Sequence, residues 1–333
     1  MSNHRSSGPI SIVVPVHCEG PGVSAFLSGI DQVFASRHES IEVILVDDGS
    51  TDDTWQIISA EASRRHNVRG LRLSRNFGKE PALCAGLDAA VGEAVFVMDG
   101  DLQHPPELMP EMLRLWAEGY DVVDAVKSDR GKESFLYRFV TRGFYGLLKV
   151  LTGYDLGNAS DFKLLDRKVV DAWTRLQERE LFFRGMVAWL GFRHARVSFV
   201  VADRANGRTR WSFFRLVHLA ATAITAFSTS ALQIISLIGA VFMLFAVLIG
   251  GQSLYHYATG TAVSGFTTVI LLQLIIGSLL MVSLGIIGGY MARIYSEVKA
   301  RPRYFVDESI GVPASRELAV RLSAAHGGRF RPN

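Results

Sequence analysis

Formal charge is absent from one long stretch of this chain. Leu216 to Ala292 forms a run of 77 residues without Asp, Glu, Lys or Arg, although charged residues make up 20% of the sequence. Two apolar blocks lie within it, at residues 230–249 and 266–290. Each has the roughly 20 residues that a helix needs to cross a hydrocarbon core of about 30 Å. The stretch therefore predicts two transmembrane helices.

Cysteine is scarce as well, with only Cys18 and Cys84 in 333 residues. This argues against a disulfide framework and favours a reducing compartment for the segment that carries them. The first nine residues are polar and lack the apolar centre of a secretory signal peptide. The net charge of +3 is too small to suggest a nucleic-acid partner.

Several familiar catalytic motifs are missing from the sequence. It contains no P-loop, and no G-x-G-x-x-G follows the first expected strand, which disfavours ATP hydrolysis and dinucleotide binding. The histidines are scattered without an H-E-x-x-H pair, which argues against a zinc hydrolase. The G-x-S-x-G elbow of serine hydrolases is absent too. The chemistry must rest on other residues.

Basic residues flank the apolar blocks and predict their orientation. Arginines at 204, 208, 210 and 215 precede the first block, Arg293, Lys299, Arg301 and Arg303 follow the second, and the loop between them has neither Lys nor Arg. By the positive-inside rule both ends are cytoplasmic and the loop is external. The expected organisation is a cytosolic catalytic domain at 1–210, a juxtamembrane helix at 211–229, two membrane helices at 230–292 with a loop at about 251–265, and a basic cytoplasmic tail at 293–333.

Two further segments have alternative interpretations. Residues 211–229 are apolar after an initial Trp and Arg, and fit either an interfacial helix or an extension of the first membrane helix. Residues 135–151 place Arg and Lys among aromatics and leucines, which is typical of a helix on a membrane surface or of an ordinary domain helix.

Apolar runs and helical patterns alternate through the first 210 residues. This alternation predicts βαβ units and a doubly wound, mainly parallel sheet of the α/β class. Strands are expected at 10–16, 41–50, 69–74, 93–101 and 120–126, and helices at about 22–36, 50–65, 79–91 and 106–118.

Polar residues follow these strands, where ligands bind in open α/β sheets. The strand ends carry His17 and Glu19, then Asp47 and Asp48, then Arg75 and Asn76, then Asp99 and Asp101. Any one of these four strand ends could simply belong to a turn without function, because Asp and Asn are common in turns. Four such ends in one domain favour a binding site.

The triplet Asp99-Gly100-Asp101 is the most informative of these ends. Two carboxylates separated by a residue without a side chain can converge on one hard cation, and oxygen ligands suit Mg²⁺ or Mn²⁺. Gln103 can add a neutral oxygen. Such a metal would in turn hold a diphosphate.

The motifs together resemble those of family-2 inverting glycosyltransferases. The segments that carry the resemblance are VVPVHCEG, ILVDDGSTDDT, SRNFGKEPAL, MDGDLQHPPE, ESFLYRFVTRGFYGLLKVLTG, ASDFKLLDRKVVDAW and LFFRGMVAWLGF. They are most similar to the branch of dolichol-phosphate mannose synthase and of bacterial polyprenyl-phosphate glucosyltransferases with two C-terminal spans, over residues 8–300. The resemblance implies a GT-A fold, a nucleotide-sugar donor, a divalent metal and a polyprenyl-phosphate acceptor.

The resemblance also implies roles for single residues. It assigns nucleotide-sugar contacts to Pro15, His17, Glu19, Val46, Asp48, Asp99, Gly100, Lys127, Arg204 and Arg210, the metal site to Asp99, Asp101 and Gln103, and the catalytic positions to Asp101 and Asp161. His17 stands where the family usually has Tyr, and Lys127 where it usually has Arg, which loses the bidentate fork. Arg204 and Arg210 are also placed to clamp a phosphate at the lipid surface.

The implied function is metal-dependent, inverting transfer of one sugar to undecaprenyl phosphate at the cytoplasmic face of a bacterial inner membrane. UDP-glucose is the first candidate donor, and a UDP-N-acetylhexosamine, a UDP-aminoarabinose derivative and GDP-mannose stay open. The acceptor phosphate is already an anion, so Asp161 is expected to orient a substrate more than to remove a proton. Glycines at 277, 285, 288 and 289 allow close helix packing or a homo-oligomer such as a tetramer, or simply reflect membrane-helix composition.

Two rival functions remain open. Processive polysaccharide synthases resemble one another in a Q-x-x-R-W motif, but Gly207 occupies the Gln position here, and two spans are few for a polymer channel. The other rival is a non-catalytic binding or scaffold subunit for a lipid-sugar flippase, against which the presence of Asp101, Gln103, Arg204 and Arg210 argues. The length of the product separates the first rival, and any metal-dependent transfer excludes the second.

Overall fold

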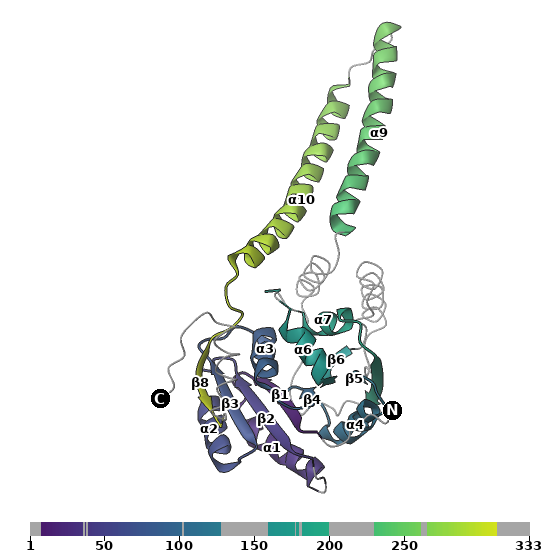
Figure 1. Ribbon diagram of the computed structural model, residues 1–333. Helices are drawn as coiled ribbons and strands as arrows, with labels where there is room; N and C mark the ends of the chain where they lie inside the picture. The colour runs from purple at the N-terminus through teal and green to yellow at the C-terminus, as the bar shows by residue number, and fades with distance from the viewer. Residues whose placement is uncertain are drawn as a thin grey trace. The chain divides into compact units, whose positions relative to one another are not determined.

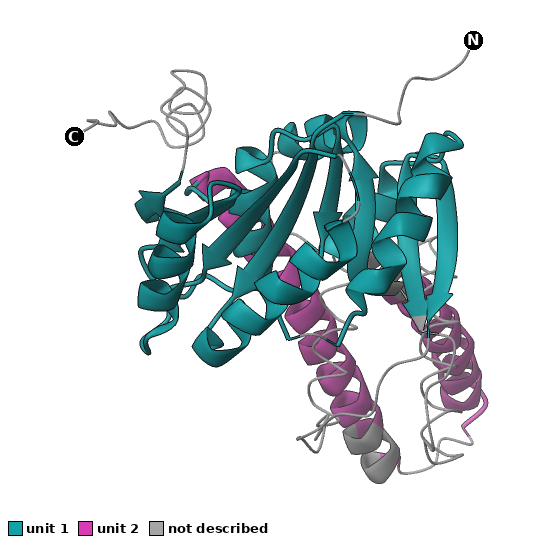
Figure 2. Ribbon diagram, turned by 90° about the horizontal axis from the view of Figure 1, so that it is seen from below, with its two compact units in different colours: residues 1–145, 154–209, 301–333 teal, residues 146–153, 210–300 magenta. Residues whose placement is uncertain are grey.

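The computed structural model describes residues 8–35, 37, 39–101, 103–127, 159–176, 178–179, 182–199, 230–260 and 265–311. The chain divides into two compact units (Figure 2). One contains residues 1–145, 154–209 and 301–333, and the other contains residues 146–153 and 210–300. The expected segments at 135–151 and 211–229 lie outside the described residues.

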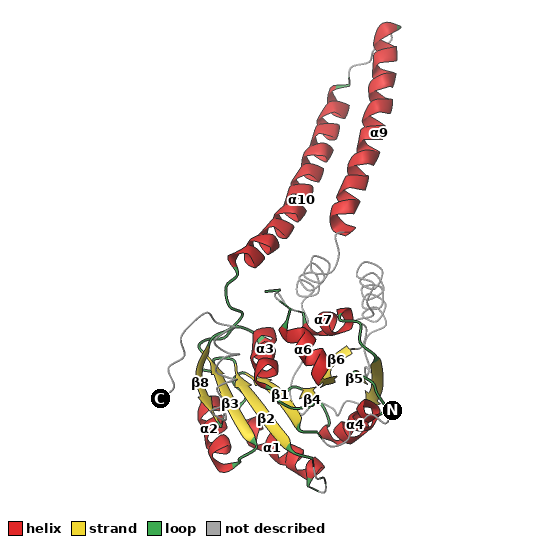
Figure 3. Ribbon diagram, viewed as in Figure 1, coloured by secondary structure: helices red, strands yellow, loops and turns green. Residues whose placement is uncertain are grey.

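The first unit is an α/β domain built on one eight-stranded sheet (Figures 1 and 3). Its strands are β1 (Ile10–Val16), β2 (Ile41–Asp47), β3 (Val68–Leu73), β4 (Ala94–Val97), β5 (Val122–Lys127), β6 (Ala159–Asp166), β7 (His194–Phe199) and β8 (Val306–Ile310). Its helices are α1 (Gly20–Phe34), α2 (Thr54–Arg64), α3 (Lys79–Ala89), the 3₁₀ turn η1 (Pro106–Leu108), α4 (Met109–Ala117), α6 (Arg167–Thr174) and α7 (Phe183–Trp189).

The strand order is β7-β5-β6-β4-β1-β2-β3-β8. Strands β1 to β4 pair in parallel, and β5 is parallel to β7, while β6 and β8 run antiparallel to their neighbours. The predicted α/β class and mainly parallel sheet are confirmed. Strands β6, β7 and β8 were not expected from the sequence.

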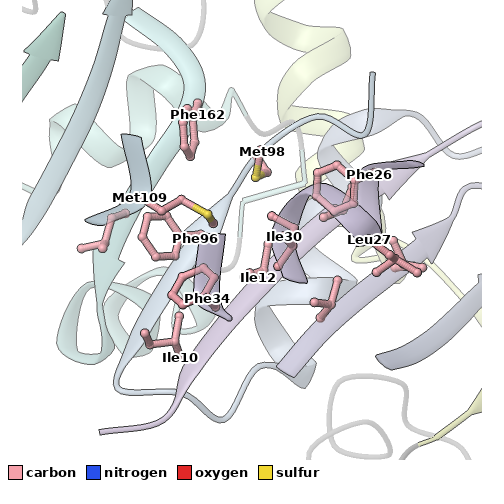
Figure 4. Close-up of a cluster of buried hydrophobic side chains, with 14 of the residues drawn as sticks. Ile10, Ile12, Phe26, Leu27, Ile30, Phe34, Phe96, Met98, Met109 and Phe162 are labelled. Atoms are coloured by element: carbon pink, nitrogen blue, oxygen red, sulfur yellow. The ribbon is translucent and has the colours of Figure 1, made fainter. Parts of the chain in front are cut away.

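Alternating side chains of β1 explain why helices cover both faces of the sheet. On one face, Ile10 and Ile12 pack with Phe26 and Ile30 of α1 in a buried cluster that reaches Phe96 and Met109 (Figure 4). On the other face, Val13 lies under α3, where a Cβ on Gly86 would be 2.2 Å from Val13 Cγ1. Glycine at position 86 therefore lets α3 approach the sheet closely.

The second unit contains two long helices, α9 (Ser230–Ala258) and α10 (Phe266–Lys299). Leu237–Ala258 and Leu272–Lys299 are long and apolar enough to cross a membrane. Both helices exceed the predicted blocks, because α9 continues into the expected loop at 251–265 and α10 continues into the expected tail. Tyr255 and Tyr257, which fall within that expected loop, lie on α9 instead.

The segment after α10 differs most from the expectation of a polar tail at 293–333. Helix α10 ends at Lys299, Ala300 takes a left-handed conformation with φ 48°, and residues 306–310 add β8 to the sheet beside β3. Tyr304 is only 3% exposed and donates a hydrogen bond to Asp88 Oδ2 at 2.7 Å. The guanidinium of Arg303 donates to the carbonyl oxygens of Leu176 and Glu178. Residues 301–311 thus belong to the α/β domain.

Candidate active site

The carboxyl ends of β1, β2 and β4 meet along one edge of the sheet. Strand β1 lies between the other two, and Pro15 is the register partner of Val46. Since parallel strands end at the same edge, the residues that follow them share one rim. His17, Asp48 and Asp99 are therefore brought together as the sequence predicted.

Asp48 and His17 connect three loops at this rim. Asp48 is 4% exposed, and its two carboxylate oxygens accept hydrogen bonds from the backbone N–H groups of Phe77 at 2.7 Å and Gly78 at 2.8 Å. The Nδ1 of His17 lies 3.0 Å from the carbonyl oxygen of Asp48, and its Nε2 lies 3.1 Å from Nδ2 of Asn76. Because a carbonyl only accepts, Nδ1 carries the proton and Nε2 accepts from Asn76. These contacts link the loops that follow β1, β2 and β3.

Two glycines permit close backbone approaches at the rim. Gly49 has φ +62°, and a Cβ there would be 2.3 Å from the carbonyl carbon of Arg75. At Gly100 a Cβ would be 3.1 Å from Val16 Cγ1 and 3.5 Å from Oε2 of Glu19. The glycine of the acidic triplet thus lets the chain after β4 lie against the end of β1.

Glu19, Asp99 and Asp101 form the acidic part of the rim. The pKa of Glu19 is raised to about 7. Burial of the Glu19 carboxyl group is the largest cause, and repulsion from the charges of Asp101 and Asp99 adds to it. Glu19 as a whole residue is exposed, so the neighbouring carboxylates crowd a group that still meets solvent. The backbone N–H of Gln103 donates to Asp101 Oδ1 at 3.0 Å and holds that carboxylate on the turn. Negative charge is therefore in excess beside Gly100.

Two basic residues that the sequence did not single out lie next to this acidic group. Lys79 Nζ is 2.5 Å from Asp99 Oδ1 and 2.6 Å from Asp161 Oδ2. The guanidinium of Arg184 donates to both oxygens of Asp161, at 2.6 and 2.8 Å. Burial alone would raise the pKa of Asp161, but the hydrogen bonds and charge of Arg184, then those of Lys79, hold it well below its usual range. The arrangement makes Asp161 a weak base.

The residues at the rim fit a hard divalent cation by their chemistry. Glu19, Asp99 and Asp101 lie close enough to repel one another, and their carboxylate oxygens are the kind of donor that Mg²⁺ and Mn²⁺ prefer. In the described part of the chain, no three His, Cys, Asp or Glu side chains are arranged as a metal site, and Asp99 is paired with Lys79. Asp99, Asp101 and Gln103 remain the residues predicted to hold a metal.

Three predicted contacts cannot be followed in the structure. Lys127 is the last residue of β5 and pairs through its backbone with Phe199, but its side chain lies outside the described residues. Arg204 and Arg210 lie outside them altogether.

Glu80 provides a stability test of this region. Burial, followed by the charge of Asp161, raises the pKa of Glu80 from 4.5 to about 7. The folded protein therefore binds this proton more tightly than the unfolded chain, so its stability falls as pH rises from about 4.5 to about 7. Glu80→Gln removes that charge and keeps an oxygen for the backbone N–H of Phe183, which lies 3.0 Å from Glu80 Oε2.

Glu80→Gln is expected to stabilise the protein by about 1–3 kcal/mol at pH 8 and by much less at pH 5. Unfolding of the full-length chain in detergent at both pH values measures the difference. A gain of equal size at pH 5 and pH 8 would show that Glu80 is not a raised-pKa group.

Comparison with known proteins places the chain in a family. Residues 11–174 match the model of the family described as Glycosyl transferase family 2. A prophage bactoprenol glucosyl transferase homolog of Escherichia coli (strain K12) is 36% identical over 299 residues, which cover 89% of this chain and 98% of that protein. The chain belongs to glycosyltransferase family 2. The family predicted from the motifs is therefore confirmed.

Other proteins match this glycosyltransferase over most of its length. An uncharacterized glycosyltransferase of Synechocystis is 37% identical over 306 residues, covering 91% of this chain and 96% of that one. The bactoprenol glucosyl transferase of Shigella phage SfII is 36% identical over 302 residues, covering 90% and 98%. A crystal structure of glucosyl-3-phosphoglycerate synthase from Mycobacterium tuberculosis aligns with TM-score 0.50 and 20% identity, over 67% of this chain and 80% of that one. The expected GT-A-type fold is confirmed.

Proposed function

We propose that this family 2 glycosyltransferase moves one sugar from a nucleoside diphosphate sugar to the phosphate of a polyprenyl lipid, with inversion at the anomeric carbon. UDP-glucose is the first candidate donor and undecaprenyl phosphate the acceptor. The observation that carries the proposal is the similarity over nearly the whole chain to proteins named bactoprenol glucosyl transferase. That similarity extends beyond the α/β domain into the two apolar helices, as expected for an enzyme whose acceptor is held in a membrane.

The path of the chain supports an active site on the cytoplasmic side. The segments before α9 and after α10 lie on the same side of the membrane in this arrangement. Strand β8 follows α10 in the sequence and pairs with β3, which precedes α9. Residues before and after the two helices therefore share one sheet, and an even number of crossings must separate them. Arg293, Lys299, Arg301 and Arg303 near the end of α10 favour the cytoplasmic side.

The rim of the sheet supplies the groups that such a transfer needs. The proposed donor lies with its nucleoside near Pro15, His17, Val46 and Asp48, and its diphosphate near Asp99 and Asp101. Asp101, Asp99 and Gln103 would hold Mg²⁺ or Mn²⁺, which when bound offsets the charge that gathers on the leaving diphosphate. A crystal structure of the glucosyl-3-phosphoglycerate synthase contains Mg²⁺ and UDP, which supports the use of a divalent metal. Lys127, Arg204 and Arg210 are proposed as further contacts to the phosphates.

The acceptor simplifies the proton chemistry. A phosphate monoester has a second pKa of about 6 and is already an anion at neutral pH, so its oxygen can attack the anomeric carbon without a general base. Asp161 is held by Arg184 and Lys79 with its pKa below the usual range. We therefore propose that Asp161 orients its partners and does not remove a proton.

A panel of nucleotide sugars tests the proposed function. Membranes or purified protein are incubated with undecaprenyl phosphate and labelled UDP-glucose, UDP-N-acetylglucosamine, a UDP-aminoarabinose derivative or GDP-mannose, with Mn²⁺, with Mg²⁺ or with a chelator. The expected product is a lipid carrying one sugar, formed from UDP-glucose when metal is present. A long polymer would favour a processive synthase, and no transfer from any donor would contradict the proposal.

A further inference from the structure

Two cations share one carboxylate on the side of the rim away from the predicted nucleoside position. Lys79 and Arg184 both contact Asp161, at 2.6 to 2.8 Å. The carboxylate side chain is only 14% exposed, whereas the side chains of Lys79 and Arg184 are 40% and 37% exposed. The aspartate is thus enclosed, and its two basic partners reach solvent. Three residues carry a net charge of +1 beside the acidic rim.

The sheet register explains why this group lies next to the acidic triplet. Strands β4 and β6 are antiparallel, with Ala94 opposite Asp166 and Val97 opposite Lys163. Continuing that register by two residues puts Asp99 opposite Asp161. Lys79 spans the two carboxylates, at 2.5 Å from Asp99 and 2.6 Å from Asp161.

Backbone hydrogen bonds position the residues that precede Lys79 and Arg184. Lys79 is the first residue of α3, and the preceding Gly78 has φ +102° and donates its N–H to Asp48. Arg184 lies near the start of α7, and the N–H of the preceding Phe183 donates to Glu80, the neighbour of Lys79. The starts of α3 and α7 are therefore joined directly. The two basic side chains are held as a pair, independently of any substrate.

We propose that Lys79 and Arg184 form a phosphate-binding pair for the acceptor, which receives the phosphate monoester of the polyprenyl lipid. This inference rests on the proposed function and assigns its acceptor site. The order of strands supports it: β2 and β1 carry the predicted nucleoside contacts, β4 carries the predicted diphosphate site, and β6 is the next strand. A donor that follows this order presents its sugar toward β6, where the two cations lie.

The reaction at this site balances without an added base. An ionised oxygen of the acceptor phosphate forms a bond to the anomeric carbon, the bond from that carbon to the nucleoside diphosphate breaks, and its electron pair leaves with the diphosphate. Arg184 Nε and Nη2 donate to Asp161, and a planar guanidinium with five N–H donors can donate to phosphate oxygens at the same time. Asp161 is then a positioning residue that keeps the two cations together.

Variants of the pair test the assignment through the two substrates separately. Arg184→Gln and Lys79→Gln are compared with Arg184→Lys, and with Arg114→Gln on α4 as a matched control, because Arg114 is an exposed cation that pairs with Glu111 and Glu118 of the same segment. Each charge-removing variant is expected to raise the KM for undecaprenyl phosphate about 10- to 100-fold. The KM for the nucleotide sugar should change less than about twofold in the Arg184 variants, which do not contact Asp99 directly, and Arg184→Lys should recover part of the loss.

A binding measurement tests the assignment without turnover, and retained binding of UDP shows that a variant is folded. Calorimetric titration of each variant with a short-chain polyprenyl phosphate and, separately, with UDP and Mn²⁺ is expected to show weakened binding of the lipid phosphate alone. Weakened UDP binding with unchanged lipid binding would assign the pair to the donor's diphosphate and overturn the proposal. Unchanged binding of both would also overturn it, since the ion pairs would then only shape Asp161.

Failure of this inference differs from failure of the proposed function. If the function is wrong, the unaltered protein does not use undecaprenyl phosphate at all. If only the inference is wrong, the unaltered protein transfers sugar to the lipid while the variants keep its acceptor KM. Should Arg184→Gln not fold, Arg184→Lys and Lys79→Gln decide the question, because Arg184→Lys keeps both positive charges and Lys79→Gln keeps Arg184 on Asp161.

Discussion

Replacing Asp101 by asparagine is expected to lower the rate of sugar transfer on the order of 1,000-fold. The carboxylate of Asp101 lies beside Asp99 and Glu19 and contributes to the crowding that raises the pKa of Glu19. Its predicted task is to hold a divalent cation against the donor's diphosphate, and a metal contributes several kcal/mol of stabilisation to developing charge. An amide keeps the shape and loses the charge. Initial rates with saturating donor and acceptor measure the effect.

The matched control is Asp307→Asn, which removes one exposed carboxylate on β8 without touching the rim. The control variant should transfer sugar at nearly the rate of the unaltered protein, and both variants should insert into membranes and unfold at similar temperatures. If Asp101→Asn kept most of the activity, the assignment of the acidic triplet would be wrong, whatever the identity of the sugar.

Ending the chain after Ala300 is expected to destabilise the α/β domain by about 3–5 kcal/mol. The deletion removes the buried Tyr304, whose burial is worth roughly 1.5–3 kcal/mol, and its hydrogen bond to Asp88, worth roughly 1 kcal/mol. It also removes β8 and so exposes the edge of β3. Such a loss is a large part of the stability of an ordinary domain.

A chain that ends after Gly311 is the control for this deletion, because it keeps Tyr304 and β8. Its α/β domain should unfold at the temperature of the full chain, whereas the chain ending after Ala300 should unfold earlier and be cut faster by a protease, although both retain α9 and α10. Equal resistance of the two shortened chains would mean that β8 does not stabilise the sheet. The comparison decides between a structural strand and the polar tail that the composition suggested.

The loss of β8 should also reach the active-site rim. The carboxylate of Glu308 accepts hydrogen bonds from Arg72 at 2.7 Å and from the indole of Trp55 at 3.1 Å. Arg72 in turn lies 3.6 Å from Asp47 at the end of β2. The ring of Phe305 packs against Phe77, whose N–H holds Asp48. The chain ending after Ala300 is therefore expected to bind nucleotide more weakly at temperatures where it is still folded.

Buried apolar strands were the part of this fold that the sequence predicted best. The run Ile10–Val16 forms β1 over that same range, and the apolar part of 41–50 forms β2. Each is buried on both faces by helices, so an unbroken apolar run was a sufficient signal. The rim followed from these strands, because parallel strands place His17, Asp48 and Asp99 at one edge.

Strand β6 escaped prediction because its charged residues interrupt the apolar pattern. Asp161 and Lys163 alternate with Phe162 and Leu164, and Lys163 is only 2% exposed. The charge of Lys163 is tolerated in the interior because Asp124 on β5 pairs with it, and His194 on β7 contacts the same aspartate at 2.8 Å. Because these partners are far apart along the chain, the sequence near Lys163 gives no sign of the ion pair. Charged residues in a segment usually indicate an exposed surface, so the buried strand was not recognised.

The same reason explains why Lys79 and Arg184 were missed while Asp161 was found. Asp161 was recognised through the ASDF segment, but its partners lie 82 and 23 residues away in the sequence. Lys79 looks like an ordinary first-turn residue of a helix, and Arg184 like one basic residue in an apolar segment. Only the pairing of β4 with β6 and the link between Phe183 and Glu80 bring these three side chains together.

Binding of UDP in the presence and absence of Mn²⁺ tests the central claim most directly. The account predicts that the unaltered protein binds UDP tightly with Mn²⁺ and at least about tenfold more weakly with a chelator, and that Asp101→Asn binds weakly in both conditions. UDP binding that is equally strong with the chelator, or a metal dependence that survives in Asp101→Asn, would contradict the claim that the acidic triplet holds the donor through a divalent cation.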